Sequence, residues 1–158
     1  MVLVDYADIM KSTSKFTEKL HQIGHVYEEL RGMAGEFDIP IWTASQANRS
    51  ALEEDVIGAE KVSEDYSKVM TADFVMSMSR KVEDKIANTG RFHVIKNRFG
   101  PDGITFPATI NTNTGTIEIY DTNTQGGQDA QGKMNNADEY IRKTLAQKKK
   151  DFDGGGFE

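Results

Sequence analysis

Val2-Leu3-Val4-Asp5-Tyr6 decides the fold, because it is a short apolar run that ends in an acid almost at the start of the chain. Its apolar residues are consecutive and not alternating, which is typical of a strand buried inside a parallel sheet. A second apolar strand is expected over Ile39–Ala44, with Pro40 at its start. Between the two, a helix is predicted that begins after a Ser14 N-cap. Its apolar positions recur at i+3 and i+4: Phe16, Leu20, Ile23, Tyr27, Leu30, Ala34 and Phe37.

The later part of the chain has a different pattern. A third strand is expected over Phe74–Met78, followed by a charged connection that reaches a turn signal at residues 88–90. Three alternating, Thr-rich runs then predict antiparallel strands: Arg91–Asn97, Ile104–Asn111 and Thr116–Tyr120. Hairpin-type turns at residues 100–103 and 113–115 separate them. The sequence therefore predicts an α/β segment with a mainly parallel sheet, followed by an antiparallel β-meander.

The domain organisation follows from the composition. Residues 1–121 are expected to form one domain with one hydrophobic core. Inside it, the polar stretch from Ser45 to Lys61 is expected to be a long and functional loop. The Gln-, Asn- and Gly-rich stretch from 122 to about 135 predicts a flexible linker, and residues 137–149 predict a polar helix in a tail that stays apart from the core.

Composition excludes several classes of protein. The 158 residues contain no cysteine, which excludes disulfides and thiolate metal sites, and they carry a net charge of −6, so a nucleic-acid contact has to come from a local patch. No membrane-spanning run or secretory signal is found, so we expect a cytoplasmic protein. His21 and His25 have i, i+4 spacing, but no third metal ligand is evident, so surface or packing roles are expected for both and for His93. Trp42 is expected in the core and not in base stacking.

Four segments carry polar residues at or near these strands: Val2–Tyr6, Ala44–Arg49, Ser63–Asp73 and Val94–Pro101. In this order they resemble the Walker B strand, the Ser-Gln sensor motif, the acidic motif and the Lys-x-Arg-x-Gly-Pro hairpin of DnaB-family replicative DNA helicases. Glu28-Glu29-Leu30-Arg31-Gly32 is similar to the helicases of T-even-like phages. The resemblance covers about residues 1–120. It implies the C-terminal part of a RecA-like P-loop NTPase core.

The resemblance assigns nucleotide roles to the ends of the first two strands. Asp5 would hold Mg²⁺ through a coordinated water, and Gln46 would bond to the γ-phosphate or its attacking water, so that hydrolysis is sensed by the loop that follows. Read alone, Asp5 would be a turn residue after a core strand and Gln46 a loop cap.

Two cations on the hairpin would act in trans. Lys96 and Arg98 are spaced at i, i+2, so both side chains leave one face of a strand. The resemblance implies that they reach the nucleotide of a neighbouring subunit, with Arg98 as arginine finger, and this requires a hexameric ring. Read alone, the pair would be solvated cations that protect an edge strand.

The resemblance also places a DNA-binding loop after the sensor. The loop over residues 47–59 would face the central channel of the ring and contact single-stranded DNA, with Asn48 and Arg49 coupling it to the sensor. A primase or a helicase loader would be a further partner.

Two parts of an ATPase are missing from the sequence. No Gly-x-x-x-x-Gly-Lys-Ser/Thr loop is found, and the resemblance places the catalytic glutamate upstream of Asp5. The chain alone is therefore expected neither to bind ATP tightly nor to hydrolyse it, and to be a piece of a longer open reading frame. The missing phosphate-loop strand would lie between the second and third strands, so we expect the chain to compact or self-associate through that edge.

Two other interpretations remain open. Another RecA-like ATPase, such as a recombinase or a KaiC-like protein, would share the strand order, although the Lys96-x-Arg98 hairpin favours the helicase. A non-catalytic binding module on the same scaffold would use the acidic, aromatic end, residues 151–153 and 157–158, as a docking tag.

Overall fold

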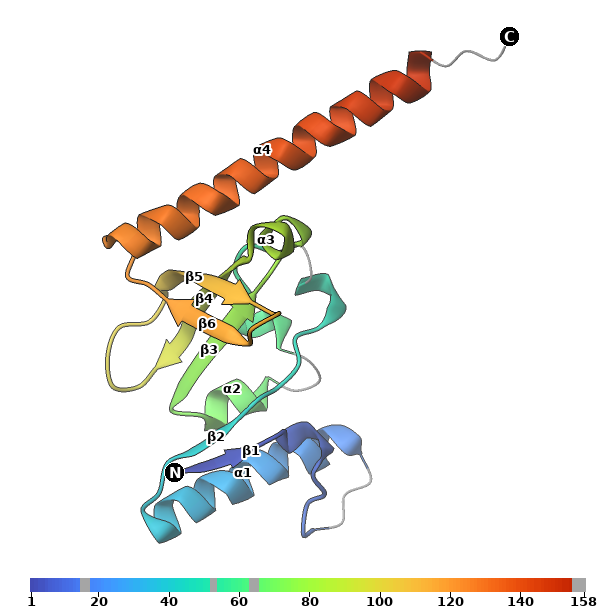
Figure 1. The fold of residues 1–158 in the computed structure, drawn as a ribbon. Helices are drawn as coiled ribbons and strands as arrows, with labels where there is room; N and C mark the ends of the chain where they lie inside the picture. The colour runs from blue at the N-terminus through green and yellow to red at the C-terminus, as the bar shows by residue number, and fades with distance from the viewer. Residues whose placement is uncertain (15–17, 52–53, 63–65, 155–158) are drawn as a thin grey trace. The chain divides into compact units, whose positions relative to one another are not determined.

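The computed structural model describes residues 1–14, 18–51, 54–62 and 66–154, and it divides into two compact units. Unit 1 comprises Met1–Ser77 and His93–Ile104, and unit 2 comprises Met78–Phe92 and the chain from Thr105 onward. In chain order the elements are β1 (Val2–Val4), η1 (Ala7–Ile9), α1 (Lys19–Phe37), β2 (Ile41–Thr43), η2 (Arg49–Ala51), η3 (Ala59–Lys61), α2 (Ser67–Thr71), β3 (Phe74–Ser79), α3 (Val82–Ala87), β4 (Thr89–Asn97), β5 (Thr105–Asn111), β6 (Thr116–Ile119) and α4 (Gln125–Gly154). Figure 1 shows these elements along the chain.

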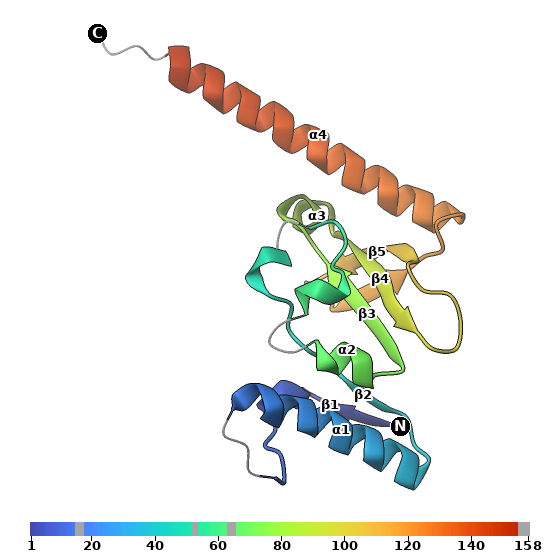
Figure 2. The same cartoon turned by 180° about the vertical axis from the view of Figure 1, so that it is seen from behind.

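The core of unit 1 lies between α1 and the two-stranded parallel sheet of β1 and β2. Val2 pairs with Ile41 and Val4 with Thr43. The apolar face of α1 packs on this sheet and on η1, as Figures 1 and 2 show from opposite sides. The buried members are Ala7, Ile23, Val26, Tyr27 and Leu30, with Val4 and Ile41 packed against them. The predicted strand–helix–strand segment is therefore confirmed.

Two local predictions in unit 1 are wrong. Ser14 does not cap α1, whose N-cap is Glu18; instead the backbone N–H of Ser14 donates to Ser12 Oγ at 3.0 Å, a local turn that competes with helix formation. Phe16 lies outside the described residues. Trp42 is 47% exposed and contacts Phe74 with ring centroids 5.8 Å apart. Side chains alternate between the faces of a strand, so Trp42 faces away from α1, while Ile41 packs on its core.

A buried polar network ties four elements of unit 1 together. The Lys68 side chain on α2 is 3% exposed, and its Nζ lies 2.8 Å from Asp8 Oδ1 and 3.1 Å from Ser45 Oγ. The Tyr27 hydroxyl on α1 donates to Asp8 Oδ1 at 2.7 Å, and Ser45 Oγ donates to Asp8 Oδ2 at 2.9 Å. A buried ammonium group is tolerated only when it is paired and hydrogen-bonded, and these contacts satisfy that requirement.

The network also shifts the ionisation of its members. Burial alone would raise the pKa of Asp8, but hydrogen bonds from Lys68, Tyr27 and Ser45 and the charge of Lys68 together lower that pKa below its ordinary value. Burial, with a further contribution from Asp8, raises the pKa of Tyr27. At neutral pH the network therefore contains a carboxylate and a neutral phenol.

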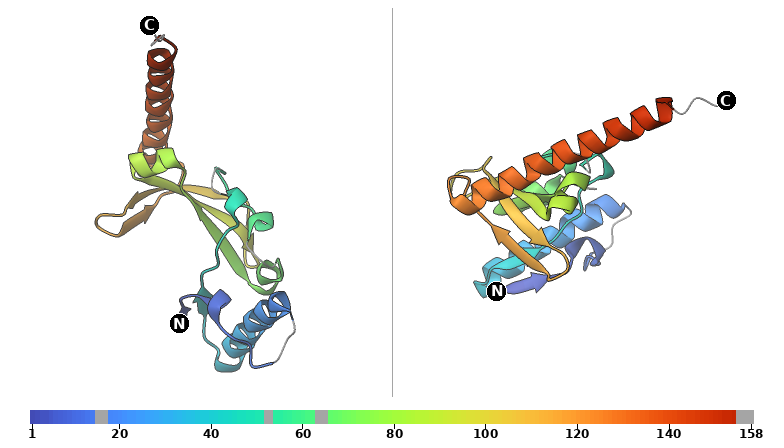
Figure 3. Two further views of the ribbon diagram at one scale, coloured as in Figure 1. Left: turned by 90° about the vertical axis from the view of Figure 1, so that its right-hand side faces the viewer. Right: turned by 45° about the horizontal axis from the view of Figure 1, so that its top comes forward.

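Unit 2 is built on the antiparallel pair of β5 and β6. Ala108 pairs with Ile119 and Ile110 with Ile117, and Phe92, Ala108 and Ile110 form a buried cluster. The long helix α4 packs on β5 and on α3 through residues at helical spacing, the buried Ala130, Met134 and Ala137. Both panels of Figure 3 show α4 running out from the hairpin.

The structure corrects the predicted linker over residues 122 to about 135, whereas the helix predicted over residues 137–149 is present as part of α4. Helix α4 begins at Gln125 and is continuous to Gly154, so the expected linker up to about residue 135 is helical and packed. The glycines that suggested flexibility lie where two parts of the chain approach each other closely. A Cβ atom on Gly127 would clash with the carbonyl oxygen of Asp121, and a Cβ atom on Gly126 would lie 2.6 Å from a ring carbon of Tyr120. Since unit 2 contains both β5 and α4, no boundary between compact units falls at residue 121.

The charged connection after β3 contains a helix, α3, which the sequence analysis did not predict. The buried Asp84 side chain accepts a hydrogen bond from the Lys81 N–H at 2.9 Å and pairs with Arg91 at 2.6 Å, which fixes the start of the helix. Asn88 ends the helix in the left-handed conformation, with φ of 54°, at the predicted turn signal.

Within the described residues the strands form two separate sheets, β1-β2 and β3-β4-β5-β6, so β2 is not joined to β3. The predicted parallel segment and antiparallel meander are both present. Self-association through the edge of a sheet remains a prediction.

Two glycine substitutions in α4 test its docking. We expect Gly127→Ala to lower the free energy of unfolding by about 1–3 kcal/mol, since the new methyl group meets a backbone carbonyl. Gly132→Ala is the control: no atom lies within 4 Å of a Cβ there, and alanine in a helix interior adds about 0.5–1 kcal/mol. Urea unfolding followed by circular dichroism measures both. Equal midpoints for the two variants would show that the start of α4 is not packed.

The network around Lys68 gives a second prediction. Lys68→Met leaves the Asp8 carboxylate buried without its cation, so the free energy of unfolding should fall by about 3 kcal/mol or more. Adding Asp8→Asn should restore part of the loss. The control is Lys143→Met, because the Lys143–Glu139 pair on α4 is highly exposed and should contribute little. A Lys68→Met variant as stable as the control would contradict the network.

Acid should weaken the same network. The folded-state pKa of Asp8 lies below its ordinary value, so the stabilisation is fully present above that ordinary value and is lost as pH falls through the lower folded pKa. We expect the Asp8→Asn variant to lose less stability than the wild type over that acidic range. Urea midpoints measured from about pH 5 downward check this, and parallel curves for the two proteins would refute it.

Candidate functional site

The first group of candidate residues lies at the carboxyl edge of the β1–β2 sheet. Asp5 follows β1 directly and is exposed, and Gln46 follows β2 by three residues. The Gln46 amide donates from Nε2 to the Tyr6 hydroxyl at 3.4 Å. The Thr43 hydroxyl donates to Val4 O at 3.0 Å and accepts the Ala7 N–H at 2.9 Å, which fixes the two strand ends together. The structure thus brings the segments of Asp5 and Gln46 to one edge, where loops after parallel strands bind ligands.

Gln46 is positioned from behind by the buried network. Its neighbour Ser45 donates to Asp8 and accepts from Lys68, so the backbone that carries Gln46 is attached to η1 and α2. The amide side chain itself is exposed. This arrangement leaves an exposed amide on an anchored segment, which suits a group that senses a ligand.

The loop after Gln46 is closed at its base. Ala47 forms an isolated bridge with Val62, and Asn48 N–H donates to Lys61 O at 2.9 Å. The Asn48 side chain accepts from Ser50 Oγ at 2.6 Å, while Arg49, the first residue of η2, is exposed. Of the two candidate DNA contacts, Arg49 is therefore the one that presents its side chain openly to solvent. The acidic segment 63–65 of the third motif lies outside the described residues.

Lys96 lies near the end of β4 and binds the C-terminal end of α2. Its Nζ donates to Val69 O at 2.9 Å and to Met70 O at 2.8 Å. The last carbonyl groups of a helix have no partner within the helix, and a cation is favourable there. Lys96 thus satisfies helix-end carbonyl groups that have no partner within the helix, and these carbonyl groups fix its position.

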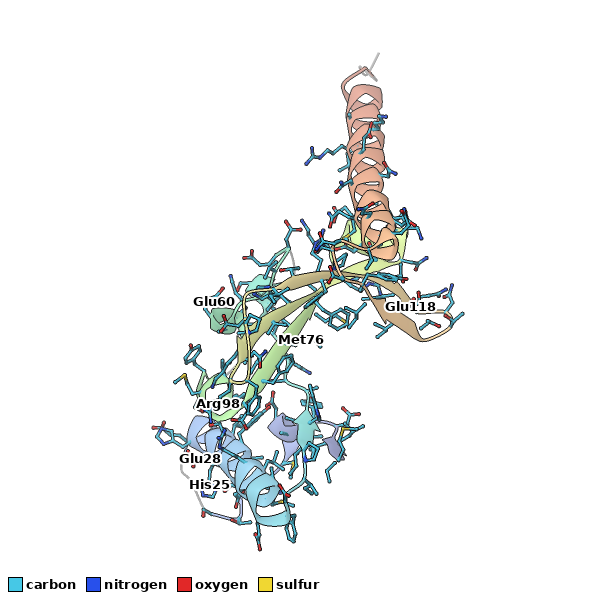
Figure 4. All side chains as sticks on the ribbon, turned by 90° about the vertical axis from the view of Figure 1, so that its left-hand side faces the viewer. His25, Glu28, Glu60, Met76, Arg98 and Glu118 are labelled. Atoms are coloured by element: carbon cyan, nitrogen blue, oxygen red, sulfur yellow. The ribbon has the colours of Figure 1, made fainter. Side chains whose placement is uncertain are left out.

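Arg98 lies one residue beyond β4 and is held by Asp73, the residue before β3. Arg98 Nη1 contacts Asp73 Oδ1 at 2.9 Å, and Arg98 N–H donates to Asp73 O at 2.9 Å. Arg31 on α1 contacts the same carboxylate oxygen at 3.1 Å and also donates to Thr71 O. Figure 4 labels Arg98 and shows it next to α1. Both arginine side chains are nearly half exposed, Arg98 at 47% and Arg31 at 42%.

The three cations Arg31, Lys96 and Arg98, with the carboxylate of Asp73, form a group that we call the basic cluster. Its positive charge exceeds its negative charge. Partial burial lowers the pKa of Lys96, as do the charges of Arg98 and Arg31, while Asp73 opposes the shift. Like charges gathered at an exposed position are unfavourable unless an anion joins them, so the basic cluster is a candidate anion site.

The predicted residues therefore fall into two groups. Asp5 and Gln46 share one edge of the β1–β2 sheet, and Lys96 and Arg98 share the basic cluster through α2 and Asp73. Sequence reasoning missed Lys68, Asp8 and Arg31. Lys68 and Asp8 carried no pattern signal, because their partners are distant in the chain. Arg31 had one, since it lies within the Glu28–Gly32 stretch that carried the resemblance.

The residues present fit part of a nucleotide–magnesium site. Asp5 is an exposed carboxylate at a strand end, and Mg²⁺ is commonly held by one or two carboxylates together with phosphates and waters. In the described part of the chain no three His, Cys, Asp or Glu side chains gather as metal ligands, and His21 and His25 instead contact Glu18 and Glu29. The sequence has no glycine-rich phosphate loop. Within the residues described, no helix is both long and apolar enough to span a membrane.

Known proteins have a similar sequence and a similar fold. A relative from Enterobacteria phage T4, described as a DnaB-like replicative helicase, is 28% identical over 103 residues, which cover 63% of this chain and 22% of that protein. The chain thus spans about a fifth of the length of that relative.

Two solved structures share the fold. One is the ATPase domain of the protein G40P, which superposes with a TM-score of 0.67 at 19% identity. The match covers 76% of this chain and 44% of the chain in that structure. The other is a DnaB-like replicative helicase described together with its interactions with primase. Its TM-score is 0.65 at 20% identity, and the match covers 73% of this chain and 29% of the chain in that structure. The mixed α/β fold is therefore that of RecA-like helicase ATPase domains. A family model for the DnaB-like helicase C-terminal domain matches residues 1–116, and the chain belongs to that family.

Proposed function

We propose that this chain is part of an ATP-dependent replicative DNA helicase that unwinds DNA by moving along a single strand. The observation that carries the proposal is the pair of cations Lys96 and Arg98, held next to each other by α2 and Asp73 in a chain of the DnaB-like family. The phage T4 relative, described as a replicative helicase, supports it.

In this proposal the two groups of residues serve two different nucleotides. Asp5 and Gln46 belong to the site of their own subunit, where Asp5 would hold Mg²⁺ through a coordinated water and Gln46 would bond to the γ-phosphate or to the attacking water. Bound MgATP supplies the phosphoryl group whose transfer to water releases energy. Lys96 and Arg98 serve the nucleotide of the neighbouring subunit, where positive charge stabilises the transferring phosphoryl group. Identical subunits therefore have to form a ring, and we infer a hexamer from the family.

DNA and protein partners follow from the same proposal. Arg49 is exposed beside the sensor segment and would contact the phosphates of single-stranded DNA, with Asn48 shaping the start of the loop. A primase is a candidate partner because one of the structural neighbours is described together with its interactions with primase. We also infer that the protein acts in the cytoplasm of a host cell, as a phage relative suggests.

A second candidate is a non-catalytic binding module on the same scaffold. The coding sequence upstream of Met1 separates the two. The helicase requires a Gly-x-x-x-x-Gly-Lys-Ser/Thr motif in frame there, and a stop codon with a ribosome-binding site in its place would leave the binding module.

The helicase proposal predicts the behaviour of an Arg98 variant. In the protein extended by that upstream sequence, Arg98→Ala should lower the rate of DNA-stimulated phosphate release by about 10³-fold or more, since the transition-state charge loses its trans cation. The 158-residue chain alone should release no phosphate. Phosphate release by a coupled assay and ring assembly by light scattering measure both effects.

The control is Arg142→Ala, an exposed arginine on α4 of unit 2, which should leave hydrolysis and assembly unchanged. Rings of the Arg98→Ala protein should assemble normally, which separates loss of catalysis from loss of structure. Wild-type hydrolysis by Arg98→Ala rings would exclude Arg98 as the trans cation.

A further inference from the structure

Arg31 is the cation of the basic cluster that lies outside the four motif segments. It lies on α1, in a different part of the chain from Lys96 and Arg98, yet its guanidinium contacts the same oxygen of Asp73 that binds Arg98. It also donates to Thr71 O, beside the two α2 carbonyls that bind Lys96. Two separate segments thus bring three cations to the end of one short helix.

Fold stability does not explain this arrangement. Asp73 and both arginines are more than 40% exposed, and exposed ion pairs contribute little to stability. The cations also oppose one another, because Arg98 and Arg31 both lower the pKa of Lys96. The basic cluster carries excess positive charge, and one carboxylate holds its two arginines at an exposed position. Such a cluster is suited to binding an anion that has several oxygen atoms.

We propose that Arg31 is a third cation of the anion site formed by Lys96 and Arg98, and that Asp73 is the positioning residue that holds both guanidinium groups ready for it. The chemical class of the ligand is a polyphosphate. On the proposed function, this ligand is the phosphate chain of the nucleotide in the neighbouring subunit. Arg31 then contributes from α1 a second bidentate donor that can share the phosphoryl oxygens with Arg98. The Asp73 carboxylate keeps the arginines in place and competes with the ligand for them.

The test uses the 158-residue chain, with sodium tripolyphosphate as the probe, and needs no hydrolysis. The NMR signals of the arginine Nε–Hε groups are followed as the probe is added. The signals of Arg31 and Arg98 should shift together with one dissociation constant, and Arg31→Gln should weaken binding by about tenfold. Arg142→Gln is the control, since it removes the same charge from an exposed site in the other unit. Equal affinities of the Arg31→Gln and Arg142→Gln proteins, or an Arg31 signal that does not move at saturation, would overturn the role of Arg31.

Asp73→Asn tests the positioning residue. Its loss should alter the Arg31 and Arg98 signals before any probe is added, because both pair with one carboxylate, and it should tighten tripolyphosphate binding, because a competing negative charge is removed. A purely structural role would not tighten binding, and unchanged affinity would overturn the assignment. Failure of Arg31 here is distinguishable from failure of the helicase proposal. If tripolyphosphate binds without a contribution from Arg31, the prediction for hydrolysis by the Arg98→Ala protein is unaffected. If the extended protein hydrolyses no ATP, the binding result for Arg31 still holds.

Discussion

The buried ammonium group of Lys68 is the interaction on which unit 1 depends. A cation that is 3% exposed has lost its water, so the protein has to supply every partner that water would have supplied. Asp8, Ser45 and the ring of Tyr27, whose centroid lies 5.6 Å from Nζ, provide them from η1, the end of β2 and α1. None of these contacts is local in the chain. They can form only when the β1–β2 sheet, α1 and α2 are all in place, so the network specifies one arrangement of these elements.

The same short helix α2 also organises the basic cluster. Its last carbonyl groups have no partner inside the helix, and Lys96 and Arg31 occupy them. Asp73 comes two residues after the helix and binds Arg31 and Arg98. Helix α2 therefore supports both groups of candidate residues. Its Lys68 side chain binds the segment that leads to Gln46, and its backbone carbonyls bind Lys96.

The sequence predicts strands and turns well here because their signals are local. Consecutive apolar residues predicted β1 and β2, and alternation between Gly- and Asn-rich turns predicted the meander. The start of α4 could not be predicted, because Gly126 and Gly127 have the composition of a linker while their role is close packing. For the candidate site, i, i+2 spacing and the family motif predicted that Lys96 and Arg98 lie together. Their contacts with Asp73 and Arg31 depend on tertiary packing between distant segments, which periodicity does not encode.

The length of α2 has a mechanical consequence. Ser67–Thr71 is little more than one helical turn, with a rise of about 1.5 Å per residue, so it has no interior hinge where bending can be absorbed. The Lys68 side chain at its start and the carbonyls of Val69 and Met70 move as one piece. Because Lys68 binds Ser45 and the α2 carbonyls bind Lys96, a single helical turn connects the segment that carries Gln46 to the basic cluster.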